Sequence, residues 1–365
     1  MLSRFYPLAG TIIDQITIDC DDAGAQFVEA RVNCLLSDIL QQLDSLLLRN
    51  FLPVETESTE AEAGRVLFVH ANFFQCGGVV IGLCISHKIA DAATISTIVK
   101  GWSAAALQSK EAAVEVCFPA ASIFPPVDTY IPPMKLVREK YVTRRFVFDA
   151  SKVAAPKTKA ASSMVQQPTR VEAVTALVWK CMMNMSRQIK GYPRLSMLSH
   201  SVDLRKKIIP HCRKTPSGTC LSNFQIVPRP SKFDKVGFAP AGLVCKLRKT
   251  TREFDENGLQ IINVEKRTWQ KMCVIDDLVD KDDIDFCTYT SWCKFQLYEA
   301  DLGWGKLVWA SLPNIMLKNL VVFMDTKDGD GVEVLATLSK QEMVVFESDQ
   351  QLLAFAAFNP THDDH

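Results

Sequence analysis

The sequence predicts a mixed α/β fold with two sheet-containing halves. The chain has 365 residues, which is too long for one small core and indicates two domains of ordinary size. Patterns typical of strands alternate with patterns typical of helices in both halves. With 48% hydrophobic and 22% charged residues, the composition is that of an ordinary globular protein. We place the two domains at residues 1–150 and 151–365.

The charge balance argues against a nucleic-acid partner. Lys+Arg and Asp+Glu both number 41, so the formal net charge is zero and no overall basic character is available to neutralise phosphates. No signal-peptide pattern opens the chain, and no apolar stretch approaches the roughly 18 residues that cross a bilayer. The 12 cysteines are scattered without a CxxC pair. We therefore expect a cytoplasmic protein with reduced thiols and no membrane partner.

The first half begins with strand patterns and one helical pattern. The turn residues Asp21–Gly24 lie between two strand patterns and predict a hairpin. Leucine and isoleucine recur at helical spacing from Leu36 to Leu47 and predict an amphipathic helix. The last strand is almost entirely apolar, which is typical of a strand buried on both faces. Strands are predicted at residues 15–20, 25–32, 65–74 and 79–86.

The period of the apolar residues changes at Asp91. Ile95, Ile98 and Trp102 recur at helical spacing and predict a helix that runs to about Gln108. Asp91 stands at the position of its amino-terminal cap. His87 therefore lies in a short turn between a strand and a helix, where an open sheet carries its functional residues.

The second half follows a proline-rich crossover at residues 117–133, which excludes helix and central strand. A strand at residues 144–148 and a weak helix come next. Thr169-Arg-Val-Glu172 is a capping box for a helix to about Met185, and Ser339-Lys-Gln-Glu342 caps the final helix. Residues 239–283 show a largely helical pattern. Further strands are predicted at residues 195–204, 224–227, 286–291, 294–298, 306–312, 319–325 and 331–338.

His87 is the first candidate for chemistry, in the segment His87-Lys-Ile-Ala-Asp91. Histidine's unperturbed pKa near 6.5 suits it to accept a proton from a hydroxyl at neutral pH. Asp91 either orients the imidazole or points away and anchors the turn. The alternative is a structural histidine beside a helix cap, and a His and an Asp at this spacing often occur together by chance.

The second candidate is Asp301-Leu-Gly-Trp-Gly305. Two glycines around a tryptophan require a tight bend, which Asp301 would pin by pairing with an arginine. The indole N–H of Trp304 is a donor, so it would stabilise an oxyanion if it faced the site. The alternative is a structural turn with Trp304 packed in the core.

No metal and no bound cofactor are predicted. His200 and Asp203 have no partner at metal-ligand spacing, and His211 with Cys212 lacks a second pair. Gly77-Gly78 does not match a phosphate-binding loop.

Taken together, the two motifs resemble the signatures of one family. Ser86-His-Lys-Ile-Ala-Asp91 is similar to the HxxxD motif, and Asp301-Leu-Gly-Trp-Gly305 to the DFGWG motif, of the plant BAHD acyltransferases. Several further blocks resemble the family, and especially its alkaloid acetyltransferase branch. These blocks are Leu2–Gly10, Phe27–Arg31, Phe74–Gly78, Thr169–Glu172, Ser201–Arg205, Thr290–Cys293 and Met324–Glu333.

The resemblance implies two similar domains of the chloramphenicol acetyltransferase-like type, with a channel between them. An acyl-CoA, with acetyl-CoA expected, would enter from one side as a co-substrate. A small-molecule acceptor alcohol, an alkaloid or another plant secondary metabolite, would enter from the other side. The resemblance also implies a monomer.

The site residues follow from the same resemblance. His87 would be the general base, and the acceptor would attack the thioester directly without a covalent acyl-enzyme. Asp91 would point away from the cavity and pair with an arginine, for which Arg205 is the candidate. Trp304 matches the residue proposed to touch the oxyanion, and the rest of its motif is structural. Asn223 would line the site.

The sequence departs from the family pattern in several places. It begins inside the family's early block, so we expect an amino-terminally truncated member that lacks roughly 60 residues. Leu302 replaces a phenylalanine, and Ser222 precedes Asn223 where the family has glycine. A truncated or non-catalytic member that keeps the fold is therefore the alternative. Condensation domains of peptide synthesis use a related motif, but with histidine and glycine at the positions of Ser86 and Ala92.

Overall fold

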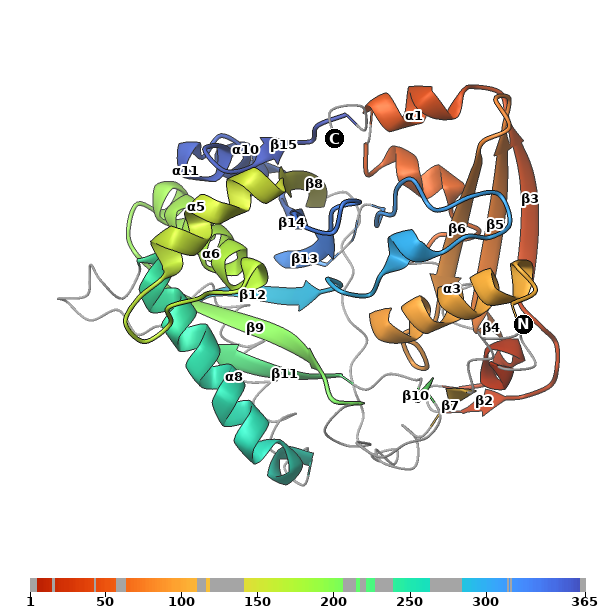
Figure 1. The fold of residues 1–365 in the computed structure, drawn as a ribbon, viewed down its shortest axis with the longest axis horizontal. Coiled ribbons are helices and arrows are strands. Elements are labelled where there is room, and N and C mark those ends of the chain that lie inside the picture. The colour runs from red at the N-terminus through yellow and green to blue at the C-terminus, as the bar shows by residue number, and fades with distance from the viewer. Residues whose placement is uncertain are drawn as a thin grey trace.

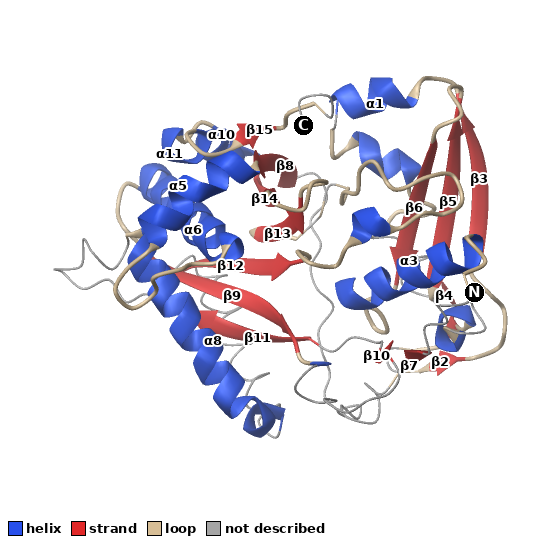
Figure 2. Cartoon of the chain, in the orientation of Figure 1, coloured by secondary structure: helices blue, strands red, loops and turns tan. Residues whose placement is uncertain are grey.

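The structure is a computed structural model that confirms the predicted mixed α/β fold (Figures 1 and 2). Figure 1 shows two lobes, one built on the strands β3, β5 and β6 and the other on a larger sheet covered by helices. The structure describes residues 5–14, 17–42, 44–56, 64–109, 116–118, 141–205, 215–216, 221–226, 239–262, 284–313, 315 and 317–361.

The first lobe contains a three-stranded sheet of order β3-β5-β6, with strands Gln26–Val32 (β3), Leu67–Phe74 (β5) and Val79–Ile85 (β6). β3 runs parallel to β5, and β6 runs antiparallel to it. The prediction that β6 is buried on both faces is wrong. It is an edge strand of this sheet and most of its residues are only half-buried.

Helix α3 (Ala92–Ala106) packs on this lobe after the turn that follows β6. Its residue Ile98 belongs to a buried cluster with Phe5, Leu8 and Val69. Gly101 allows the helix to approach this cluster, because a Cβ there would lie 2.9 Å from the Phe5 ring. The predicted helix from Asp91 is therefore confirmed, with Asp91 as its amino-terminal cap and its middle packed on the core.

The predicted hairpin around Asp21–Gly24 is wrong. β2 (Ile18–Asp19) pairs with β1 (Thr11–Ile12), which also pairs with β4 (Gly64–Arg65), whereas β3 belongs to a different sheet. The carboxylate of Asp21 accepts hydrogen bonds from the Thr11 hydroxyl and the Ala23 N–H. The turn is thereby held against β1, and the chain leaves it toward the other sheet.

The predicted helix from Leu36 to Leu47 is shorter than expected. α1 spans Leu36–Gln42, and a separate 3₁₀ turn, η3, spans Leu47–Phe51. Between them the Asp44 carboxylate accepts a hydrogen bond from the Leu46 N–H. This local bond competes with helix continuation. A further 3₁₀ turn, η2, spans Tyr6–Ala9.

The second lobe contains a seven-stranded sheet of order β11-β9-β12-β13-β14-β8-β15. β12 runs parallel to both β9 and β13, and the other neighbours are antiparallel. Its strands are Tyr141–Phe148 (β8), Leu195–Asp203 (β9), Leu221–Ile226 (β11), Ile284–Ser291 (β12), Leu320–Asp325 (β13), Val332–Ser339 (β14) and Ala357–Phe358 (β15). A two-stranded sheet pairs Val116–Cys117 (β7) with Thr215–Pro216 (β10).

The division between the sheets does not fall at residue 150. β8 precedes that position, yet it pairs along its length with β14 and also with β15. The apolar residues Phe146 and Phe148 of β8 belong to the core of the second lobe. The change of sheet therefore occurs before Tyr141. The predicted crossover after Phe118 and the predicted helical segment 263–283 lie outside the described residues.

Helices cover one face of the large sheet (Figure 2). Trp179 of α6 is fully buried and its indole N–H donates to the Ser196 hydroxyl of β9 at 2.8 Å. The predicted capping boxes at Thr169 and Ser339 are both formed. The helices of this lobe are Ala150–Ala160 (α5), Arg170–Lys190 (α6), Pro240–Ile262 (α8), Lys340–Glu347 (α10) and Gln350–Leu353 (α11).

Two predicted strands, at residues 294–298 and 306–312, are wrong. Lys294 and Gln296 have φ values of 72° and 54°, and a 3₁₀ turn at Leu297–Glu299 (η4) follows. The segment runs along α3 instead of joining the sheet (Figure 1). Among the residues that the structure describes, no helix has both the length and the apolar character to span a membrane.

Candidate active site

The two lobes are joined by a buried ion pair between Asp91 and Arg205. Asp91 caps α3, and its Oδ1 accepts hydrogen bonds from the Thr94 N–H and hydroxyl, each at 3.0 Å. The same oxygen accepts from Arg205 Nη2 at 2.6 Å. The predicted pairing is therefore confirmed. Asp91 Oδ1 thus accepts three hydrogen bonds that anchor the start of α3, as the anchoring interpretation of Asp91 expects.

Arg205 is held by a second carboxylate from its own segment. Its Nη1 donates to Asp203 Oδ1 at 2.8 Å, and its backbone N–H donates to the same oxygen at 3.0 Å. Burial alone would lower the pKa of Arg205, but the hydrogen bond and charge of Asp91, together with Asp203, raise it. The guanidinium stays charged and clamps the start of α3 to the end of β9.

His87 lies in the tight turn between β6 and α3. The N–H groups of Ile89 and Ala90 both donate to the Ser86 carbonyl at 3.1 Å, which closes the turn. Lys88 is anchored separately, because its ammonium donates to the Asp14 carbonyl at 3.3 Å. The His87 side chain is exposed. The turn therefore presents His87 at the surface of the first lobe, four residues before the buried cap.

A second connection fixes the same helix to the other lobe. The Ser96 hydroxyl of α3 donates to the Phe295 carbonyl at 2.7 Å, in the loop that follows β12. Lys100 donates to the Gln296 side chain one turn further along. The amino-terminal half of α3 is thus attached both to the end of β9, through Asp91, and to the end of β12, through Ser96. His87 stands at this end of the helix.

The bend at Asp301 is formed, and no arginine among the described residues pairs with the Asp301 carboxylate. Asp301 Oδ1 accepts hydrogen bonds from the N–H groups of Gly303 at 2.8 Å and Gly305 at 3.0 Å. Both glycines have positive φ, 93° and 109°, which explains why the bend needs them. The Asp301 N–H donates to the Ser103 hydroxyl of α3. Backbone N–H donors therefore fix the bend through Asp301, which an arginine was expected to do.

The bend that carries Trp304 is bonded to α3 near the end of the helix opposite Asp91. The bend lies beside Ser103, which is twelve residues beyond Asp91 and hence about 18 Å further along α3. The Trp304 side chain is 67% exposed. The core-packing alternative is therefore wrong, and the oxyanion role of Trp304 stays a prediction.

Strands β9 and β12 carry a row of hydroxyl side chains that the sequence patterns did not predict. Leu198 and Tyr289 point to the helix-covered core, so their strand neighbours point to the opposite face. That face carries Ser199 beside Thr288 on paired strands. The pattern continues at the strand ends with Ser201 and Thr290.

The hydroxyl row faces away from the helices and lies next to the clamped end of α3. Ser199 is 4% exposed, yet none of the four hydroxyls forms a hydrogen bond with a described residue. Sequence alternation around Leu198 was the available signal, but it needs the strand pairing to show that the hydroxyls form one surface. Such a surface is suited to hydrogen-bonding a polar ligand.

Asn223 lies next to this row by backbone register. It is paired with Ser201 across β11 and β9. Its side chain lies outside what the structure describes, so its expected role in lining the site stays a prediction. No group of three or more His, Cys, Asp or Glu residues that would hold a metal occurs among the described residues.

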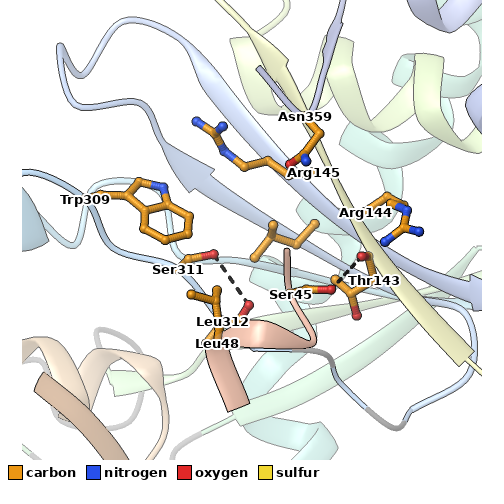
Figure 3. A pocket seen from close by; sticks show the side chains of 10 residues that line it. Ser45, Leu48, Thr143, Arg144, Arg145, Trp309, Ser311, Leu312 and Asn359 are labelled. Carbon is orange, nitrogen blue, oxygen red and sulfur yellow. Dashed lines mark hydrogen bonds between the residues drawn. The ribbon is translucent and has the colours of Figure 1, made fainter. Parts of the chain in front are cut away.

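A small pocket lies elsewhere between the lobes, where Ser45 donates to the Thr143 carbonyl (Figure 3). Its volume of about 20 Å³ is enough for a water molecule and too small for a substrate. Trp309 and Arg145 line it, and Arg145 is paired with Glu333. The indole N–H of Trp309 is buried without a partner among the described residues. We assign this pocket to packing between the lobes.

The sequence and the fold match a known class of transferases. A family model described as the transferase family matches residues 1–353. The BAHD acyltransferase BIA1 of Arabidopsis thaliana is 35% identical over 98% of this chain and 84% of its own length. Stemmadenine O-acetyltransferase of Catharanthus roseus is 32% identical over 96% of this chain and 81% of its own length.

The crystal structure of vinorine synthase has the same fold. It superposes with a TM-score of 0.83 at 29% sequence identity, covering 97% of this chain and 82% of the other. The two-lobed architecture is thus that of an acyl-transferring enzyme. The chain belongs to the BAHD acyltransferase family, and it is an acyltransferase.

Proposed function

We propose that this protein transfers an acetyl group from acetyl-CoA to a hydroxyl of an alkaloid or a related plant secondary metabolite. The observation that carries the proposal is the His87 turn, held at the end of α3 that Arg205 clamps to β9. The family's use of acyl-CoA supports the donor. The names of vinorine synthase and stemmadenine O-acetyltransferase support the acceptor class and the acetyl group.

In the proposed mechanism His87 accepts the proton of the acceptor hydroxyl while that oxygen attacks the thioester carbonyl. The tetrahedral intermediate collapses and expels the coenzyme A thiolate, and no covalent acyl-enzyme forms. General base catalysis of this kind contributes about 10²–10⁴-fold, and positioning of the two substrates supplies much of the rest. The clamp between Asp91 and Arg205 positions the turn and takes no part in proton transfer.

The hydroxyl row of β9 and β12 would form one wall of the expected channel. Ser199, Ser201, Thr288 and Thr290 offer donors and acceptors to the polar parts of a substrate. Their position beside the end of α3 supports a path that leads past them to His87.

The test is thiol release from acetyl-CoA by the purified chain with a panel of alkaloid alcohols. Acceptor-dependent release is expected in the wild type and a loss of at least about 10²-fold in His87→Ala. Lys88→Ala, which changes the neighbouring exposed side chain, should keep the rate within a few-fold. Circular dichroism and a thermal melt check that each variant is folded.

Near-normal turnover in folded His87→Ala would contradict the mechanism. A folded wild-type chain that binds coenzyme A but releases no thiol with any acceptor would favour the alternative, a non-catalytic family member. The expected monomer and cytoplasmic location stay predictions, to be tested by light scattering and by fractionation of the native tissue.

A further inference from the structure

Two cysteines outside the proposed active site lie at the ends of neighbouring strands. β3 and β5 are parallel, and the last residues that they pair are Val32 and Phe74. Cys34 and Cys76 each follow two residues after that pair. Since the two strands run in the same direction, both cysteines leave the sheet at the same end.

Two hydrogen bonds hold the loops that carry these cysteines together. The Gln75 N–H donates to the Cys34 carbonyl at 3.3 Å. The Leu36 N–H donates to the Cys76 sulfur at 3.4 Å. Because Leu36 is two residues from Cys34, the Cα of Cys34 lies within roughly 9–10 Å of the Cys76 sulfur. A disulfide needs a Cα separation of about 4.4–6.8 Å, so the proposed bond requires the two loops to approach to that separation.

The two thiols are also accessible and differ from the buried cysteines. Cys76 is exposed and Cys34 is half-buried. The backbone N–H groups of Leu36 and then Gly78 lower the pKa of the Cys76 thiol. In contrast, burial raises the pKa of Cys181 and Cys287 and makes these thiols unreactive.

We propose that Cys34 and Cys76 form a dithiol site that hydrogen peroxide oxidises to a reversible disulfide. The Cys76 thiolate attacks one peroxide oxygen, so an S–O bond forms, the O–O bond breaks, and the leaving hydroxide takes a proton to become water. The Cys34 thiolate then attacks the Cys76 sulfur and expels a second hydroxide, which also becomes water. The two thiols lose two electrons, and the peroxide is reduced to two water molecules.

The disulfide would join the tip of the β5–β6 hairpin to the entrance of α1. It would restrict the unfolded chain between the two residues, so the oxidised protein is expected to melt several degrees higher than the reduced protein. A reductant such as dithiothreitol should reverse the shift.

The experiment treats the full chain with hydrogen peroxide, blocks the remaining thiols by alkylation, and maps the peptides by mass spectrometry without reduction. The wild type should give a peptide in which Cys34 and Cys76 are linked. Cys34→Ser should stop at a sulfenic acid on Cys76, which dimedone traps. Cys76→Ser should give neither product. Cys20→Ser, which removes another exposed cysteine, should leave the link unchanged.

The proposal is overturned if peroxide leaves both thiols reduced while it oxidises Cys20, or if Cys76 is found linked to a different cysteine. Equal dimedone labelling of Cys76 in the wild type and in Cys34→Ser would also contradict it, since no second thiol would then be resolving the sulfenic acid. None of these readouts depends on acyl transfer, so the outcome is independent of the proposed function.

Discussion

Arg205 shows how one side chain determines where a turn more than 100 residues away is held. It binds Asp91 across the lobes and Asp203 within its own segment. The two carboxylates differ in exposure, because the Asp91 side chain is fully buried and that of Asp203 is 38% exposed. Removing the Asp91 carboxylate should therefore change the free energy of unfolding by a different amount than removing the Asp203 carboxylate.

Asp91→Asn should lower the free energy of unfolding by about 3–5 kcal/mol, because it leaves a buried guanidinium without its buried partner. Activity should fall with it, since the His87 turn loses its anchor. The matched control is Asp203→Asn, which should cost about 1 kcal/mol or less because that pair is partly in solvent. Urea unfolding of the three proteins measures both effects. Equal losses in the two variants would contradict the proposed clamp.

Ser201 and Ser196 offer a paired test on one strand, because they lie on opposite faces of β9. Ser201→Ala should raise the KM for a substrate several-fold and leave stability nearly unchanged, since its hydroxyl has no hydrogen bond within the described chain. Ser196→Ala should leave KM unchanged and destabilise by about 1–3 kcal/mol, because it leaves the buried Trp179 N–H unpaired. Steady-state kinetics and urea unfolding separate the two. An unchanged KM in Ser201→Ala would remove this residue from the channel wall.

Among elements, α6 and α8 are linked by an ion pair between Glu172 and Arg248. This pair should make the free energy of unfolding depend on pH. Burial alone would raise the pKa of Glu172, but hydrogen bonds from Arg248 and from the Thr169 N–H outweigh burial and lower it. A carboxyl with a lowered folded-state pKa contributes stability above its unfolded value near 4.5, and that stability is lost as pH falls through the folded value.

Glu172→Gln should therefore lose stability at pH 7 and show a weaker fall in stability between about pH 5 and pH 3 than the wild type. Urea midpoints measured across this range check the prediction. Parallel curves for the two proteins would show that Glu172 does not contribute to the acid sensitivity.

The Asp301–Gly305 bend should be sensitive in its backbone and tolerant at its tryptophan. Trp304→Ala should keep kcat within about threefold, because the indole is 67% exposed and lies toward the far end of α3. Gly305→Ala should lower stability by about 1–3 kcal/mol, since its φ of 109° strains any side chain. A large fall in kcat in folded Trp304→Ala would restore the oxyanion interpretation.

Elements whose signals are local could be predicted from the sequence, and elements that depend on distant partners could not. The caps at Asp91, Thr169 and Ser339 use residues within one helical turn, and all three are present. The prediction of a hairpin at Asp21–Gly24 was wrong because β3 pairs with β5, about 40 residues later. The hydroxyl row was missed for the same reason, since it exists only once β9 and β12 are paired.

At the scale of the whole molecule, the family resemblance predicted a contact between distant residues that local sequence patterns could not predict. The Asp91–Arg205 pair spans more than 100 residues, and no spacing rule would have selected Arg205 among the basic residues. The resemblance was less informative about Trp304, and the arginine expected beside Asp301 came from the residue types alone. At Asp301 the carboxylate accepts hydrogen bonds from the backbone N–H groups of Gly303 and Gly305, which a residue motif does not encode.

Because β8 belongs to the large sheet, it is synthesised long before the strand with which it pairs. Its partner β14 begins at Val332, 184 residues after β8 ends at Phe148. At a synthesis rate of about 5–20 residues per second, β8 waits roughly 10–40 s for that partner on the ribosome. Through this interval an apolar strand has two unpaired edges, so the nascent chain should depend on chaperones more than a protein whose strands pair in order of synthesis.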